Sequence, residues 1–128
     1  TILNDVSARD VQTAHKQWYF GKSLDGFTPI GPCIVTADAF ADYPPRLGIR
    51  SFVNGEKRQD SNTALQIFDI DHVIAELSQG MTLKAGTIIA TGTPAGVGMG
   101  MDPPQFLKPG DVVRCEIDGI GTLTNPVE

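Results

Sequence analysis

A chain of 128 residues, 41% of them hydrophobic, is long enough to enclose one core, and we expect one domain without a linker. A net charge of −5 without any basic run argues against nucleic acid and against an anionic membrane as partners. No apolar stretch approaches the roughly 20 residues of a membrane span. Fourteen glycines and nine prolines favour a β-rich fold with many turns over a helical bundle.

The first half of the chain is predicted to contain a strand, a short helix and a second strand, at residues 2–5, 7–18 and 32–36. Three apolar side chains recur at helical spacing in the helix and should face the core: Val11, Ala14 and Trp18. The two cysteines, Cys33 and Cys115, lie in apolar, strand-like contexts far apart in the sequence. Buried free thiols are the expectation, which suits a reducing cytoplasm.

The second half is predicted to be mainly strands. Asn54-Gly55 is a strong hairpin signal, because both positions of such a turn need positive φ. The remaining expected elements are strands at 47–53 and 57–59, a helix at 71–79 capped by Asp69 or Asp71, a strand at 86–91 buried on both faces, a turn at 108–111, and a hairpin of 112–117 with 120–124. Many short strands with two short helices predict a mostly β, α+β fold, as a mixed β-roll or β-sandwich.

Three polar residues near the start of the first helix are candidates for a site. Asp5 precedes the helix, and Arg9 and Gln12 share one of its faces. A carboxylate suits a hard cation, a guanidinium forks onto a ligand carboxylate, and an amide both donates and accepts. The alternative is a capped helix, with Ser7 as N-cap and Arg9 in solvent.

Four segments, taken in order, resemble the fumarylacetoacetate hydrolase family. They are residues 4–12 (Asn-Asp-Val-Ser-Ala-Arg-Asp-Val-Gln), 21–25 with Gly31-Pro32 after them, 53–59 (Val-Asn-Gly-Glu-Lys-Arg-Gln), and 90–98 (Ala-Thr-Gly-Thr-Pro-Ala-Gly-Val-Gly). The similarity covers nearly all of the chain. It implies the family's mixed β-roll, a homodimer and a small-molecule 2-oxo acid substrate.

The resemblance also implies site roles. Asp5 would be one protein ligand of Mg²⁺ or Mn²⁺, with Ca²⁺ as an alternative. Lys22 and Arg9 would be catalytic beside the metal, with the Lys22 ammonium stabilising an enolate oxygen. Gln12 and Thr93 would bind the substrate. The structural alternatives are a solvated lysine at Lys22 and a tight turn at Thr93.

The family's Glu-x-Glu metal-binding pair has no counterpart among the glutamates Glu56, Glu76, Glu116 and Glu128. We therefore expect this chain to be the C-terminal part of a single catalytic domain, with that pair and a His/Glu lid located upstream. The two histidines, His15 and His72, are interpreted as surface residues. Glu56, Lys57 and Arg58 are expected to be solvated hairpin charges, with contact to a substrate or partner as the alternative for Arg58.

The expected function is hydrolysis of a C–C bond in an acylpyruvate-type 2-oxo acid through a metal-stabilised enolate. Oxaloacetate decarboxylation, isomerisation of a 2-hydroxy-diene-dioate, and dehydration or lysis of a keto-deoxy sugar acid share this enolate and are the alternatives. A non-catalytic β-roll that binds a partner or a small acid is the competing hypothesis if the natural chain begins at Thr1.

Overall fold

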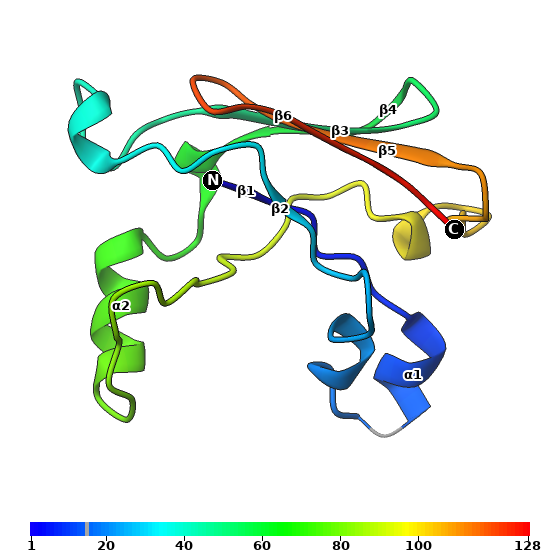
Figure 1. Cartoon of the computed structure of the whole chain (residues 1–128), viewed down its shortest axis with the longest axis horizontal. Coiled ribbons are helices and arrows are strands. Elements are labelled where there is room, and N and C mark those ends of the chain that lie inside the picture. Colours follow the sequence, from blue (N-terminus) through cyan, green and yellow to red (C-terminus); the bar gives the residue numbers. More distant parts are fainter. Residues whose placement is uncertain (15) are drawn as a thin grey trace.

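The computed structural model describes residues 1–14 and 16–128 and arranges them as two antiparallel sheets with short helices (Figure 1). The larger sheet has the order β4-β3-β5-β6, built from β3 (Gly48–Val53), β4 (Glu56–Asn62), β5 (Val112–Ile117) and β6 (Gly121–Pro126). The smaller sheet pairs β1 (Ile2–Leu3) with β2 (Ile30–Gly31). The α-helices are α1 (Arg9–Ala14) and α2 (Ile70–Ser78), and 3₁₀ turns lie at Phe20–Lys22, Ala37–Ala39, Thr63–Leu65 and Gly98–Gly100. This is the α+β class expected from the sequence.

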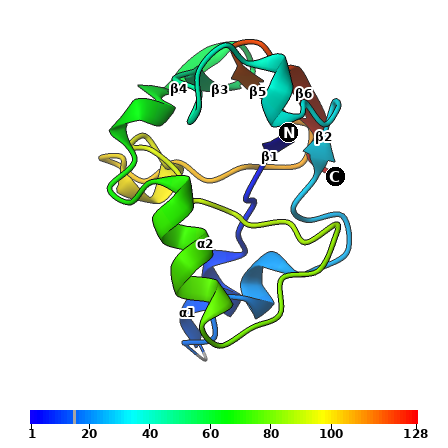
Figure 2. The same cartoon turned by 90° about the vertical axis from the view of Figure 1, so that its left-hand side faces the viewer.

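In the view of Figure 1 the larger sheet lies at the top of the molecule, and α1 and α2 lie below it, apart from each other. Turning the molecule by 90° shows the same sheet curving over β1 (Figure 2). The segment that follows α2 runs back towards the sheet and passes beneath it. No helix in the described part of the chain is both long enough and apolar enough to span a bilayer.

Both predicted hairpins are present. Asn54 and Gly55 have φ values of 52° and 84°, so the β3–β4 turn uses the positive-φ pair that the sequence predicts. Its Asn54 side chain donates to Asp111 Oδ1 at 2.9 Å and accepts from Val112 N at 2.9 Å, which ties this turn to the start of β5. The 108–111 turn is also confirmed, since Asp111 N donates to Lys108 O at 3.0 Å.

The β3–β4 ladder contains a bulge that the sequence did not predict. Ser51 pairs with Gln59 and Phe52 with Lys57, so Arg58 is the extra residue. A bulge redirects the side chains of the bulged strand, and bulges are frequent beside functional sites. The consequence here is that Gln59 stays paired with Ser51 while Arg58 leaves the regular alternation.

Helix α2 agrees with expectation to within one residue at each end. Its cap is Asp69, whose Oδ1 accepts a hydrogen bond from His72 N at 2.8 Å. His72 is exposed and stacks on Phe68, with ring centroids 4.6 Å apart, so its interpretation as a surface residue is confirmed. The other histidine, His15, lies outside the described residues.

The first helix differs from its prediction. It covers only Arg9–Ala14, and the buried residue on it is the polar Gln12, which is 4% exposed. Trp18, expected in the core, is 67% exposed, and Ala14 is exposed as well. The core face predicted from the spacing is therefore wrong, because the buried face is decided by the neighbouring segment 20–22, which packs against α1.

Two predicted strands are not formed. Residues 86–91 have no strand assignment, and Ile88 in their apolar centre is 57% exposed. Residues 32–36 are also irregular, the strand there being β2 just before them. A strand needs a neighbour to supply its ladder, and neither segment has such a neighbour among the residues the structure describes.

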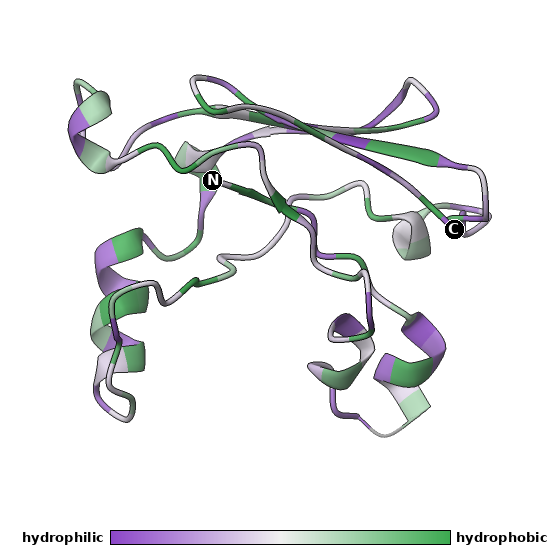
Figure 3. Cartoon of the chain, viewed as in Figure 1, coloured by the Kyte–Doolittle hydropathy of each residue, from purple (hydrophilic) through white to green (hydrophobic). Residues whose placement is uncertain are grey.

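The fully buried hydrophobic core of the described residues is small. It consists of Ile2 and Val113, which are 1% and 7% exposed. β1 is uniformly hydrophobic, and hydrophobic residues also lie along α2, away from the sheet (Figure 3). Both cysteines are free, but only Cys115 is partly buried, and desolvation raises the pKa of its thiol; Cys33 is exposed, contrary to expectation.

Candidate functional site

The ammonium of Lys22 forms an ion pair with the carboxylate of Asp5. Asp5 lies just after β1, and Lys22 ends the 3₁₀ turn Phe20–Lys22. Both side chains remain partly open to solvent, 33% and 25% exposed respectively. The bonded oxygen of Asp5 is Oδ2, so the carboxylate still offers Oδ1 to a further ligand.

Close packing at Gly21 holds this pair in place. Ala8 N donates to Gly21 O at 2.8 Å, which joins the start of α1 to the residue before Lys22. A side chain at Gly21 would meet Ala8 O and Gln12 Cβ at 2.9 Å each, so only glycine allows this approach. The packing fixes where Lys22 leaves the backbone relative to α1.

Arg9 and Gln12 are joined directly. Arg9 Nη1 donates to Gln12 Oε1 at 2.9 Å across one turn of α1. No ion pair between Arg9 and either Asp5 or Asp10 is found among the described contacts. The hydrogen bond fixes the Gln12 amide, because the oxygen must face the guanidinium and the nitrogen must point the other way.

Thr93 is held from the sheet rather than from α1. Gln59 Nε2 donates to Thr93 Oγ1 and to Pro94 O, both at 2.8 Å. The oxygen of the same carboxamide accepts from Ser51 Oγ at 2.8 Å. Gln59 therefore connects the turn that follows residue 91 to the β3–β4 ladder.

Two glycines after Thr93 allow close approaches of the backbone, and one of them, Gly96, lets the loop lie directly on β4. A Cβ at Gly96 would come within 2.0 Å of Arg58 O, and one at Gly98 within 1.9 Å of Gln105 O. A larger residue at Gly96 would push the loop away from the strand, and one at Gly98 would collide with another part of the same loop. The glycine-rich run thus brings Thr93 close to the sheet.

Arg58 is not the solvated charge that the sequence predicts. Its side chain is 16% exposed, bonds Gln105 Oε1 and Met101 Sδ, and pairs with Glu56 Oε2 at 3.2 Å. Its bulge position turns it onto residues 101–105, so it braces the loop that carries Thr93. Glu56 and Lys57 are exposed, as expected.

The structure thus joins Asp5 to Lys22 and Arg9 to Gln12 around α1, and it attaches Thr93 to the sheet through Gln59. Sequence reasoning missed Gln59, although it ends one of the four segments that carry the resemblance. Its position at the end of that segment was the available signal. The contact itself needs the bulge, which the sequence did not reveal.

A divalent cation fits these residues in part. Asp5 provides a carboxylate oxygen of the kind hard cations prefer, beside cationic groups suited to an anionic ligand. Among residues 1–14 and 16–128, no group of three or more His, Cys, Asp or Glu side chains is placed to hold a metal. Asp5 alone therefore does not make a complete metal site, and its role as one ligand stays a prediction.

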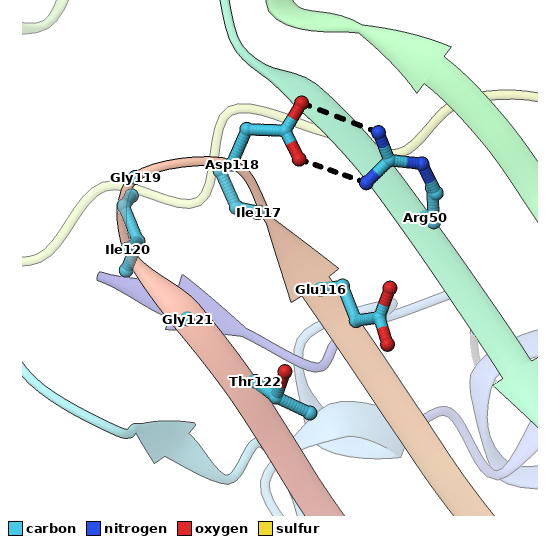
Figure 4. A pocket seen from close by; sticks show the side chains of 8 residues that line it. All are labelled: Arg50, Glu116, Ile117, Asp118, Gly119, Ile120, Gly121 and Thr122. Atoms are coloured by element: carbon cyan, nitrogen blue, oxygen red, sulfur yellow. Dashed lines mark hydrogen bonds and ion pairs between the residues drawn. The ribbon is translucent and has the colours of Figure 1, made fainter.

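A hollow lies elsewhere in the molecule, around the β5–β6 turn (Figure 4). It is lined by Arg50 and residues 116–122, none of them a predicted site residue. Arg50 donates to both oxygens of Asp118, at 2.9 and 3.2 Å. Its cationic group is thus occupied within the sheet, and the polar residues around α1 remain the better candidate site.

The whole chain, residues 1–128, matches the family model described as fumarylacetoacetate (FAA) hydrolase, C-terminal. The chain belongs to the fumarylacetoacetate hydrolase family. The resemblance of the four segments is thereby confirmed, and so is the fold class.

Relatives with names include the oxaloacetate tautomerase YisK of Bacillus subtilis, 51% identical over 127 residues. The mitochondrial oxaloacetate tautomerase fahd2 of Xenopus laevis is 51% identical over 129 residues. Each match covers 99% of this chain but only 42% and 40% of those proteins. The chain therefore spans about two fifths of the length of these relatives.

Solved structures of the family superpose closely on this fold. The fumarylacetoacetate hydrolase of Exiguobacterium antarcticum matches with a TM-score of 0.95 at 54% identity, covering 100% of this chain and 46% of that one. The 2-hydroxyhepta-2,4-diene-1,7-dioate isomerase of Mycobacterium marinum matches with a TM-score of 0.85 at 47% identity, covering 98% and 46%. Homologues of this chain thus include enzymes named as tautomerases, isomerases and hydrolases.

Proposed function

We propose that this chain supplies part of the active site of an enzyme that converts a small 2-oxo acid through its enolate, with keto–enol tautomerisation of oxaloacetate as the reaction. The observation that carries the proposal is the Asp5–Lys22 pair. The names of two relatives that are 51% identical favour oxaloacetate as the substrate.

Charge development explains why this pair suits the reaction. Removing a proton from C3 of a 2-oxo acid moves negative charge onto the C2 oxygen, and a preorganised cation near that oxygen lowers the barrier. When bound, Mg²⁺ or Mn²⁺ would polarise the 2-oxo group. Asp5 would hold the ion through its carboxylate, and Lys22 would donate to the oxygen that gains charge.

The other residues would bind and orient the acid. Arg9 supplies a fork of donors to carboxylate oxygens, and its bond to Gln12 aims the Gln12 amide nitrogen away from itself. Thr93 would bind an oxygen of the substrate carboxylate. The further carboxylate ligands and the group that moves the C3 proton would come from outside residues 1–128.

Hydrolysis of an acylpyruvate C–C bond is the second candidate, favoured by the name of the Exiguobacterium structure. It passes through the same enolate and would use the same residues. Decarboxylation and dehydration of related acids also remain compatible with this half of a site. A non-catalytic binding domain would show no dependence on metal.

The deciding experiment uses the full-length enzyme with and without Mg²⁺ or Mn²⁺. Conversion of enol-oxaloacetate to the keto form is followed by absorbance, beside parallel assays for decarboxylation and for acylpyruvate cleavage. Metal-dependent tautomerisation faster than the other two reactions is the expected result. Turnover of none of these acids, with any divalent metal, would contradict the proposal.

A further inference from the structure

Gln59 makes more hydrogen bonds than its position on a short strand requires. Its carboxamide nitrogen donates to Thr93 Oγ1 and to Pro94 O, and its oxygen accepts from Ser51 Oγ. Pro94 O is a carbonyl and can only accept, so the nitrogen of Gln59 must face it. The amide has one orientation that satisfies all three partners.

That orientation has a consequence for Thr93. Since Gln59 presents an N–H to Thr93, the hydroxyl oxygen has to accept, and the hydroxyl's own proton points to a different acceptor. If the neighbouring side chain were a carboxylate or a carbonyl, the threonine hydroxyl would instead donate its one proton to that side chain. Thr93 is exposed, so its proton can reach a ligand.

From this we infer that Gln59 is a positioning residue, which fixes the Thr93 hydroxyl as a hydrogen-bond donor towards an anionic oxygen of the substrate. The inference rests on the proposed function for the chemical class of that ligand, a 2-oxo acid carboxylate. Ser51 contributes to this positioning, because its hydroxyl donates to the Gln59 oxygen and so holds that oxygen away from Thr93. The hydrogen bonds from Ser51 to Gln59 and from Gln59 to Thr93 attach an irregular loop to the rigid sheet.

The backbone around Ser51, Gln59 and Thr93 supports the positioning role of Gln59. The bulge at Arg58 keeps Gln59 opposite Ser51, and Gly96 allows the loop to lie against β4 within reach of the amide. Arg58 braces residues 101–105 on the same side. A loop that only connected two elements would not need an amide with three partners at Thr93.

The test compares four variants of the full-length enzyme: Gln59→Met, Gln59→Glu, Thr93→Val and the double variant Gln59→Met/Thr93→Val. Gln59→Met should raise the KM for oxaloacetate about tenfold while kcat stays within about twofold, as for a weakened bond to a charged group. Gln59→Glu should raise it further, because a carboxylate would take the Thr93 proton and repel an anion. Gln66→Met, an exposed glutamine changed in the same way, is the control and should leave KM unchanged.

The double variant separates positioning from a general structural role. If Gln59 acts through the hydroxyl, Gln59→Met should add little to the KM of Thr93→Val. Effects that multiply, or an unchanged KM in Gln59→Met, would overturn the inference. Thermal unfolding midpoints of all variants identify any variant that misfolds. If Gln59→Met misfolds, Ser51→Ala replaces it in the comparison, and its expected rise in KM is smaller than that of Gln59→Met.

Binding of oxalate, measured by calorimetry in the presence of Mg²⁺, gives a readout that does not depend on turnover. Wild-type protein that neither binds oxalate nor converts any 2-oxo acid would contradict the proposed function. The amide orientation is tested separately, by hydrogen exchange of the Gln59 side-chain NH₂ followed by NMR. Slow exchange that becomes faster in Thr93→Val supports the inference, whereas exchange as fast as that of an exposed glutamine overturns it.

Discussion

Lys22 and Asp5 lie 17 residues apart in the sequence, and their side chains are in contact at the base of β1. The Phe20–Lys22 turn is packed on α1 through Gly21, so the contact is set by tertiary structure and not by a flexible surface lysine. In the proposed site the carboxylate and the ammonium act on the same ligand from adjacent positions, and two predictions separate their roles.

Asp5→Ala should abolish metal-dependent turnover in the full-length enzyme and leave its fold intact. A hard cation held by a few carboxylates loses most of its affinity when one is removed. Metal affinity by calorimetry and turnover of oxaloacetate are the measurements. Asp10→Ala, an exposed carboxylate on α1, is the matched control and should behave as wild type. Metal binding retained in Asp5→Ala would refute the assignment.

Lys22→Met should lower kcat far more than it lowers metal affinity. Loss of one preorganised donor to a developing oxyanion costs about 10²–10³ in kcat. The measurement is kcat for oxaloacetate beside the dissociation constant for Mn²⁺. Lys84→Met, at an exposed lysine outside the site, should change neither value. An unchanged kcat in Lys22→Met would return this residue to the solvated-surface alternative.

The ion pair between Arg50 and Asp118 gives a pH prediction. Hydrogen bonds from Arg50 hold the pKa of Asp118 below its usual range. A carboxyl group with a lowered folded-state pKa stabilises the fold above its unfolded pKa of about 4, and that contribution is lost as the pH falls through the folded value. Asp118→Asn should therefore lower the unfolding midpoint at pH 7, with the difference from wild type vanishing in strong acid.

Unfolding midpoints between about pH 2 and pH 7 check this pattern. Asp38→Asn, at an exposed site outside the sheet, should not reproduce it. A constant difference between wild type and Asp118→Asn across that range would show that the carboxylate stabilises through packing and not through its charge.

The full-length protein is predicted to be a homodimer or a dimer of dimers. β4 and β6 are the edges of the larger sheet, and unpaired edges favour association. Exposed apolar side chains add to this, with Tyr19 at 81% and Ile67 at 92% exposed. Sedimentation at micromolar concentration should give a mass at least twice that of the chain, and a monomer would contradict the prediction.

The elements predicted correctly from the sequence are those whose signals are local. Asn54-Gly55 specifies its turn through backbone conformation, Asp69 caps α2 through its own side chain, and the strands of both hairpins follow from short connections. The strand expected at 86–91 was wrong because an apolar run shows what could be buried but not what lies beside it. The core face of the first helix was wrong for the same reason, since packing by Gly21 decides which face is buried.

The candidate site also has features that the sequence predicts and features that only the folded structure shows. The roles of Asp5, Arg9, Gln12, Lys22 and Thr93 came from the family resemblance, and they stay predictions. The structure adds contacts that no pattern could supply: Lys22 with Asp5, Arg9 with Gln12, and Gln59 with Thr93. The last of these depends on a bulge, a change of register by one residue, and register is a property of the paired strands together.

Residues 1–128 expressed alone are predicted to be catalytically inert and weakly stable. Ile2 and Val113 are the fully buried hydrophobic residues of the described chain, whereas Trp18, Ile67, Ile88 and others are exposed. Stability near 5–15 kcal/mol, usual for a domain, is the small excess of burial over the large entropy cost of ordering, and so small a core leaves little excess. Thermal unfolding should therefore be broad and should begin at low temperature.

The same segment should gain almost no stability from Mg²⁺ or Mn²⁺. A ligand stabilises a fold only to the extent that it binds the folded state, and Asp5 alone would leave most of the coordination shell to water. The measurements are the unfolding midpoint with and without each metal, and turnover of oxaloacetate. The full-length enzyme in the same buffers is the positive control. A cooperative, metal-stabilised and active 128-residue protein would show that the remaining ligands come from this chain itself or from a second copy of it.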